Sequence, residues 1–256
     1  MRFLSAVIIT FNEEHNILRC IQSLKMVADE ILIMDSFSTD YTKKIALSEG
    51  VRVIEQKFSG YGSQKNAAVA VSKFDFILNL DADEFLSPEL SDSIIKEKNK
   101  GFSADAYSMN RLNKYRGQWI RHGTWYPDRK VRLYNRTKGQ WSDTLVHEEV
   151  MMSPGSTQQR LNGNLMHFAY ETEEQHIDKN RKYSTLSALS MWERGKRTTK
   201  MSLVINPAWA FILSYFIKLG MLDGLNGFRI AKNVAGLTHM KNLKLLLLQK
   251  GERLTE

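Results

Sequence analysis

Two aspartates separated by one residue, Asp81 and Asp83, carry the sharpest chemical signal in the sequence. They follow a run that is apolar nearly throughout, Phe74 to Leu80, which predicts a buried strand. Alternate side chains of an extended segment point the same way, so the two carboxylates are expected to face together. Such carboxylates repel unless a cation lies between them, and Mg²⁺ takes one or two carboxylates plus phosphate oxygens. The pattern therefore indicates a site for a divalent cation and a phosphate-bearing ligand; an ordinary Asp-rich turn is the alternative.

Two further polar groups could serve the same ligand. Asp35 ends another predicted strand, where α/β proteins often place an acid that accepts hydrogen bonds from a ribose or a base. Its alternative role is to cap the next helix, which Ser38 or Asp40 could also do. Residues 60–68 open a helix with small side chains and one cation, Lys65, which would let a backbone and an ammonium approach a pyrophosphate. A flexible loop is the alternative for that segment.

The elements that must position these groups alternate along residues 1–100. Strands are predicted at 4–9, 30–35, 51–54 and 74–80, and helices at 17–24, 41–48 and 64–71. The first helix is expected to bury Ile17, Leu18, Ile21 and Leu24. This order predicts a mostly parallel sheet with helices on both faces and right-handed crossovers. Ligands of such sheets bind at the carboxyl ends of the strands, so the polar clusters at 10–13, 35–36 and 81–84 should converge on one edge.

The rest of the chain is predicted to form two further parts. Residues 101–172 contain short Trp- and Arg-rich strands, including 130–134, which predict a smaller mixed sheet of the same domain. Residues 173–256 are predicted to form a helical extension, with one helix near 173–194, another starting at Asn206-Pro207 and a last one ending at 243–248. His167 and His176 are expected to cap or pack.

Composition and missing motifs exclude several classes. The chain has 256 residues, 43% hydrophobic and 25% charged, which is enough for a sizeable core. Its single cysteine, Cys20, allows neither an internal disulfide nor a cysteine zinc cage and fits a reducing compartment. There is no Gly-x-Gly-x-x-Gly after the first strand and no Gly-Lys-Ser/Thr loop, which disfavours dinucleotide oxidoreductases and P-loop enzymes. A zincin helix would need a second histidine where Met151 stands.

The positive charge is confined to the last third of the chain. Residues 179–256 carry 14 basic and 4 acidic side chains, whereas residues 1–178 carry 22 and 24. This asymmetry indicates an anionic partner, either nucleic acid or an anionic membrane surface. The aromatic-rich segment 208–217, flanked by cations, favours a helix lying on anionic headgroups; a buried core or dimer helix is the alternative. No run reaches 18 apolar residues, so a spanning helix is not expected.

Four motifs, taken in order, resemble those of the inverting nucleotide-sugar glycosyltransferases of family 2, which have the GT-A fold. They lie within residues 3–150 and read Ile9-Thr10-Phe11-Asn12-Glu13-Glu14, Ile33-Met34-Asp35-Ser36, Gln64-Lys65-Asn66-Ala67-Ala68 and Asn79-Leu80-Asp81-Ala82-Asp83-Glu84. Lys65 departs from the Arg of many relatives, which replaces a bidentate fork by a point charge. Shorter segments at 125–128, 130–134, 146–148 and 222–224 resemble the branch that extends the lipopolysaccharide inner core.

The resemblance implies transfer of a hexose, with glucose favoured, from a UDP-sugar to a lipid-linked saccharide such as the lipopolysaccharide inner core, with inversion at the anomeric carbon. It implies a Mg²⁺ or Mn²⁺ ion on Asp83 and a general base at Glu148, for which Glu149 and Asp143 are the alternatives. The implied donor-binding residues are Thr10, Asn12, Glu13, Asp35, Lys65, Asn66 and Asp81. The candidate acceptor-binding residues, which could instead pack across strands, are Trp125, Arg129, Arg132 and His147.

Other interpretations remain open at this point. The acceptor could be another cell-envelope polysaccharide or lipid carrier, or the chain could be a relative that has lost activity. A nucleic-acid-binding module using the basic tail is disfavoured, because aromatics and cations interleave sparsely and the acidic cluster at 81–84 would repel a phosphate backbone. The expected location is cytoplasmic, peripheral on the inner face of the cytoplasmic membrane. The sequence makes no prediction of the oligomeric state.

Overall fold

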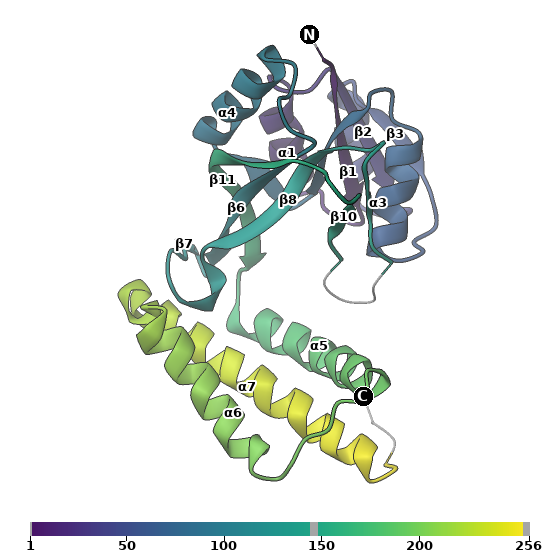
Figure 1. Ribbon diagram of the computed structural model, residues 1–256. Coiled ribbons are helices and arrows are strands. Elements are labelled where there is room, and N and C mark those ends of the chain that lie inside the picture. Colours follow the sequence, from purple (N-terminus) through teal and green to yellow (C-terminus); the bar gives the residue numbers. More distant parts are fainter. Residues whose placement is uncertain (1, 144–147, 253–256) are drawn as a thin grey trace. The chain divides into compact units, whose positions relative to one another are not determined.

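The computed structural model describes residues 2–143 and 148–252 and divides the chain into two compact units (Figure 1). The first unit comprises residues 1–111 and 129–167, and the second comprises 112–128 and 168–256. These boundaries differ from the division at residues 100 and 172 that the sequence suggests. The reason is that residues 112–128 pack with the C-terminal helices, around the buried side chains of Tyr115, Ile120 and Ile230.

A mixed sheet forms the frame of the first unit. Its parallel half consists of β1 (Leu4–Thr10), β2 (Glu30–Asp35), β3 (Arg52–Glu55) and β4 (Phe76–Asp81), in the order β3-β2-β1-β4. The sheet continues through β8 (Asp128–Asn135), β6 (Ala106–Tyr115), β11 (Gln158–Tyr170) and β5 (Glu84–Leu86). A separate antiparallel pair joins β9 (Gly139–Trp141) to β10 (Val150–Met152). The predicted α/β fold is confirmed, but most strands after residue 100 extend the main sheet.

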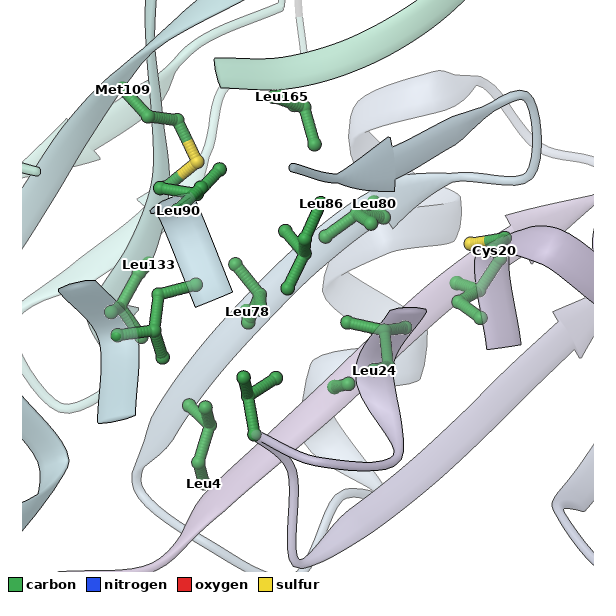
Figure 2. Close-up of a cluster of buried hydrophobic side chains, with 14 of the residues drawn as sticks. Leu4, Cys20, Leu24, Leu78, Leu80, Leu86, Leu90, Met109, Leu133 and Leu165 are labelled. Carbon is green, nitrogen blue, oxygen red and sulfur yellow. The ribbon is translucent and has the colours of Figure 1, made fainter. Parts of the chain in front are cut away.

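Helices cover both faces of the parallel half because the side chains of β1 alternate. Leu4, Ala6 and Ile8 enter one buried cluster with α1 (Ile17–Leu24), α2 (Thr42–Ser48) and α4 (Pro88–Asn99) (Figure 2). Val7 and Ile9 enter the opposite cluster with α3 (Tyr61–Ala70). Each fully buried aliphatic side chain contributes about 1.5–3 kcal/mol, so this alternation fixes which face each helix covers.

Two helices of the first unit differ from expectation. In α1 the buried residues are Ile17, Cys20, Ile21 and Leu24, whereas Leu18 is exposed. The expected inclusion of Leu18 was wrong, because Cys20 completes the i, i+3, i+4, i+7 stripe that faces the sheet. The helix α4 was not predicted, although the residues at its start carry a local signal. Ser87 accepts a hydrogen bond from the Leu90 N–H, and Pro88 occupies the first helical position.

Among its described residues, the second unit contains a short strand, two short 3₁₀ helices, one π-helical segment and three longer helices. These are β7 (Gln118–Trp119), η1 (Gly123–Trp125), α5 (Glu173–Glu193), α6 (Ser202–Ile212), η2 (Leu213–Ile217), η3 (Gly220–Asp223) and α7 (Gly224–Gln249). A capping box formed by Thr172 and Gln175 starts α5, as expected near residue 173.

The helix expected to start at Asn206-Pro207 begins four residues earlier, at Ser202, with Pro207 inside it. Proline has no N–H, so the Leu203 carbonyl loses its usual donor in the helix. The His239 Nδ1 lies 2.9 Å from that carbonyl oxygen. A histidine on α7 therefore replaces the missing helical hydrogen bond, which explains why Pro207 does not mark the start.

An aromatic core around His176 holds the second unit together. The imidazole stacks on Tyr170 with centroids 4.7 Å apart and planes 15° apart, and its Nδ1 lies 3.2 Å from Asn233 Nδ2. Its ring is also 5.6 Å from that of Tyr115. Burial, aided by the charge of Lys179, lowers the pKa of His176 to about 4. The expectation that this histidine packs is confirmed.

We expect His176 to make the stability of the second unit depend on pH. Because its folded pKa lies below the unfolded value, the unfolded state binds more protons between the two pKa values, and the stability is lost as pH falls through this window. Lowering the pH from 7 to 5 should therefore reduce the free energy of unfolding by about 2 kcal/mol from this group alone. Urea titrations at both pH values should show a smaller loss in His176→Phe than in the wild type. The exposed His15→Gln should match the wild type, and an unchanged pH dependence in His176→Phe would contradict the assignment.

Candidate functional site

The three predicted polar clusters meet at the carboxyl ends of the parallel strands. In the β1–β2 pair Thr10 lies opposite Asp35, and in the β1–β4 pair Ile9 lies opposite Asp81. Parallel strands end at the same edge of a sheet, so the following loops also lie there. The predicted convergence of residues 10–13, 35–36 and 81–84 is confirmed.

Hydrogen bonds tie the loop after β1 to the loop after β2. Asn12 has a positive φ of 53°; its N–H donates to the Ser38 hydroxyl at 2.9 Å, and its Oδ1 accepts the Thr39 N–H at 2.8 Å. Asp35 is fully buried, and its carboxylate accepts both the N–H and the hydroxyl of Ser38. Asp35 therefore organises the turn that follows it. Each carboxylate oxygen keeps a second lone pair for a ligand.

Thr10, the last residue of β1, and Glu13, in the segment that follows, differ in their hydrogen bonding. The buried Thr10 Oγ1 has no hydrogen-bond partner among the described residues. Glu13 accepts a hydrogen bond from Asn16 Nδ2 at 2.8 Å. Burial raises the pKa of Glu13, and the charge of Asp83 adds to the rise, against the lowering effect of Asn16. Thr10 thus offers a buried hydroxyl, and Glu13 places a second carboxyl close to Asp83.

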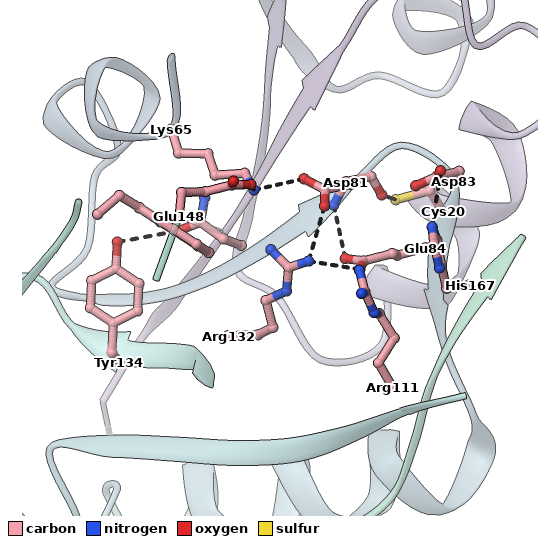
Figure 3. Close-up of polar contacts among 12 residues, drawn as sticks. Cys20, Lys65, Asp81, Asp83, Glu84, Arg111, Arg132, Tyr134, Glu148 and His167 are labelled. Carbon is pink, nitrogen blue, oxygen red and sulfur yellow. Dashed lines mark hydrogen bonds and ion pairs between the residues drawn. The ribbon is translucent and has the colours of Figure 1, made fainter. Parts of the chain in front are cut away.

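Lys65 on α3 is the centre of the site (Figure 3). Its side chain is 1% exposed, and its Nζ lies 3.0 Å from Asp81 Oδ1 and 3.1 Å from Glu148 Oε1. The same Nζ lies 4.3 Å from the centroid of a Trp141 ring, which adds a cation–π contact. The ammonium is therefore held by two carboxylates and an indole.

Close packing of α3 against β9 brings Lys65 to this position. The Asn66 side chain forms two hydrogen bonds of 2.9 Å with the backbone N–H and C=O of Trp141. A Cβ at Gly62 would lie 2.0 Å from the Ser142 carbonyl oxygen, so only glycine permits this approach. Both polar atoms of Asn66 are thus engaged in joining the helix to the strand.

Arg132 and Glu84 complete the surroundings of Asp81. Arg132 is buried, and its Nη2 lies 2.9 Å from Asp81 Oδ2 and 2.7 Å from Glu84 Oε1. Glu84 also lies 3.4 Å from Arg111 Nη1 and accepts the Asp81 N–H at 3.1 Å. Burial alone would raise the pKa of Asp81, but the charges of Lys65 and Arg132 hold it well below its usual range. Asp81 is therefore ionised within a network of buried ion pairs.

Asp83 belongs to a different environment from Asp81. The strand ends at Asp81 and residues 82–83 form a turn, so the strand alternation behind the expectation that both carboxylates face together does not extend to Asp83. Asp83 Oδ2 lies 3.2 Å from His167 Nε2. The antiparallel pairing of β5 with β11 places His167 opposite Glu84 and so beside the turn. His167 was expected to cap or pack, and its place in the site was not foreseen.

Asp83 and His167 provide one oxygen and one nitrogen donor that a divalent cation could share. Across residues 2–143 and 148–252, no three His, Cys, Asp or Glu side chains are arranged to hold a metal ion. Further ligands would have to come from a substrate or water, as Mg²⁺ and Mn²⁺ commonly accept. The Cys20 Sγ lies 3.8 Å from the Asp81 carbonyl, and burial raises the pKa of its thiol, so Cys20 is a neutral packing group.

The remaining predicted residues are dispersed. Glu149 is exposed and donates its N–H to Ser142 Oγ at 3.1 Å, and Asp143 is exposed and accepts the Ser63 hydroxyl at 3.0 Å. Arg129 is exposed on β8. Trp125 belongs to the second unit, where its ring meets that of Tyr115 edge to face at 5.5 Å. His147 lies outside the described residues.

A family model for glycosyl transferase family 2 matches residues 5–156. The chain belongs to this family. It is 31% identical over 230 residues to the lipopolysaccharide core biosynthesis glycosyltransferase LpsC of Rhizobium meliloti, covering 88% of this chain and 85% of the relative. It is 32% identical over 237 residues to the uncharacterized glycosyltransferase RT0209 of Rickettsia typhi, covering 89% and 81%. Among solved structures, Staphylococcus aureus TarS 1–349 aligns with a TM-score of 0.47 at 14% identity, covering 98% of this chain and 92% of that chain.

In this family 2 glycosyltransferase, we expect Glu84 to be essential for stability. Glu84→Gln leaves the buried Arg132 without a full countercharge, and breaking a buried pair typically reduces the free energy of unfolding by about 3–5 kcal/mol. Urea unfolding followed by circular dichroism measures the loss. The matched control is Glu55→Gln, whose exposed pair with Lys43 at 2.8 Å should contribute less than about 1 kcal/mol. Equal losses in the two variants would contradict the role of the buried network.

Proposed function

We propose that this glycosyltransferase moves a hexose, with glucose favoured, from a UDP-sugar to a lipid-linked saccharide such as the lipopolysaccharide inner core, with inversion at the anomeric carbon. The family membership and the LpsC relative, which is similar over most of its length, support this choice. The observation that carries the proposal is the Lys65 bridge, which holds the carboxylate of Glu148 beside that of Asp81 at the ligand-binding edge of the sheet. The carboxylate proposed to act on the acceptor, that of Glu148, thus lies near Asp81, which belongs to the motif proposed to bind the donor.

The donor nucleoside would bind across the loops that follow β1 and β2. Asp35 is already fixed by Ser38 and retains lone pairs for a base or ribose. Thr10 offers a buried hydroxyl that no described residue engages. The linked loops carrying Asn12 and Glu13 would close around the same ligand. Lys65, which was expected to bind the donor directly, would in this arrangement hold Asp81 and Glu148 in place beside it, because its ammonium is paired with both carboxylates.

A divalent cation would bind at Asp83 and His167 and complete its shell with the diphosphate of the donor. Such a cation neutralises the charge that develops on a departing diphosphate. Asp81 has a different task, since Lys65 and Arg132 already balance its charge. Its remaining lone pairs would hold the ribose or the sugar.

The general base for the acceptor hydroxyl is assigned to Glu148. Inverting displacement requires a base on the side of the sugar opposite to the leaving group. In Figure 3, Glu148 and Asp83 lie on either side of Asp81, which supports giving the base and the cation to these two residues. Glu148 is 22% exposed and its carboxylate is oriented by Lys65, so it is both accessible and positioned.

The metal assignment is tested by calorimetric titration of UDP. With Mn²⁺ the wild type should bind UDP much more tightly than with EDTA, and Asp83→Asn should remove most of the difference because it weakens the proposed metal site. His167→Gln should act in the same way, and the exposed Asp92→Asn on α4 should behave as the wild type. Equal affinities with Mn²⁺ and EDTA in the wild type would remove the metal from the proposal.

The base assignment is tested by turnover of a UDP-sugar, measured as UDP release with a lipopolysaccharide-core acceptor. Glu148→Gln keeps the size of the side chain but cannot accept the proton, so kcat should fall by roughly 10²–10⁴ with UDP affinity nearly unchanged. Glu149→Gln and Asp143→Asn are matched controls from the same segment and should retain most activity. Should one of these abolish turnover while Glu148→Gln does not, the base is that residue instead.

A further inference from the structure

The second unit presents an apolar face that its own core does not explain. The face consists of Met201, Ile205, Trp209, Ile212 and Phe216, spaced by three or four residues along α6 and η2, and these side chains are between 41% and 68% exposed. All of α6 is described, and none of its residues is fully buried. Contiguous exposed apolar surface of this kind marks a binding site.

The opposite side of the same segment is fixed to α7. The Phe228 ring lies 5.8 Å from that of Phe211 and 5.7 Å from that of Tyr215. His239 contacts the Leu203 carbonyl freed by Pro207. At the bend, a Cβ at Gly227 would lie 1.8 Å from the Gly220 carbonyl oxygen, so the elements approach closely. The apolar face is therefore held on a packed scaffold.

Cations flank this face along the chain. Residues 194–222 contain no Asp or Glu and five cations, namely Arg194, Lys196, Arg197, Lys200 and Lys218. The next carboxylate, Asp223, is 5% exposed and accepts the N–H groups of Arg121 and His122. Its charge is thus directed into the unit, and the surroundings of the face attract anions.

We propose that this apolar face docks on an anionic phospholipid surface, with α6 lying along the boundary between headgroups and acyl chains and the flanking cations on lipid phosphates. A second copy of the chain fits less well, because a symmetric interface would place this cationic border close to itself. Among the described helices, none alone has the length and apolar composition to cross a bilayer. One pair, Ser202–Ile217 with Gly220–Gln249, meets both measures together but is bent by 71°.

The inference rests on the proposed function in one respect, since a lipid-linked acceptor would be reached from such a surface. Its test requires neither donor nor acceptor. Full-length protein is sedimented with vesicles of phosphatidylcholine containing phosphatidylglycerol, and with vesicles of phosphatidylcholine alone. We expect sedimentation with the anionic vesicles at low salt and release as ionic strength rises, because surface attraction is screened.

Substitutions should locate the contact. Ile205→Ser combined with Trp209→Ser should lower the vesicle partition coefficient about tenfold or more, because two side chains no longer enter the apolar layer. Met26→Ser, at a 78% exposed methionine of the first unit, should leave it unchanged. Brominated phospholipids should quench tryptophan fluorescence in the wild type and in Trp192→Phe but much less in Trp209→Phe.

Four results would overturn the inference. They are full sedimentation of the double variant, no preference for anionic vesicles, resistance of the bound protein to alkaline carbonate, and a wild-type dimer that the double variant dissociates into monomers. Dissociation of a dimer by the double variant would assign the face to a second copy of the chain. Resistance to alkaline carbonate would assign it to a bilayer-crossing segment. Sedimentation without UDP release would contradict the proposed function alone, whereas UDP release without sedimentation would contradict only the membrane surface.

Discussion

The buried ammonium of Lys65 is the constraint on which the site depends. A charge that is 1% exposed must be paired, and Lys65 finds its partners in Asp81, at the end of β4, and Glu148, just before β10. Satisfying it requires α3 to approach the segment after β9, which Gly62 permits and Asn66 secures. One ion-pair triad thus joins three parts of the first unit at the edge where ligands bind.

The ion pairs of Lys65 and Arg132 give the two aspartates of the motif, Asp81 and Asp83, different surroundings. Asp81 is balanced by Lys65 and Arg132, and Glu84 in turn balances Arg132. Asp83 lies outside this network, beside His167. Because Lys65 and Arg132 already offset the charge of Asp81, the metal site that we propose for the motif rests on Asp83. The buried network of Asp81, Arg132 and Glu84 is therefore separate from the neighbouring pair of Asp83 and His167.

The second unit contains a long apolar segment that is ordered although it is not buried. Its core is the aromatic cluster around His176, whose lowered pKa reflects that burial. The helix α6 continues through Pro207, because His239 contacts the Leu203 carbonyl that the proline leaves without a helical hydrogen bond. The apolar face of α6 then remains on the surface of the unit, which is the observation behind the membrane contact that we propose.

From the amino-acid sequence one can predict the alternation of strands and helices in the first hundred residues, the convergence of the polar clusters, and the family. The first two follow from local apolar periodicity and from the rule that parallel strands end together, so β2 was predicted at its observed bounds. The family follows instead from the resemblance of the four motifs. The sequence did not reveal that residues 82–83 form a turn, that His167 lies beside Asp83, or that Arg132 and Lys65 are buried partners of Asp81. The contact of Arg132 with Asp81 joins residues 51 positions apart, and that of Lys65 with Glu148 joins residues 83 positions apart. Their geometry depends on a turn, a strand register and a close helix approach. Such features leave no local pattern, because they arise from packing between elements rather than within them.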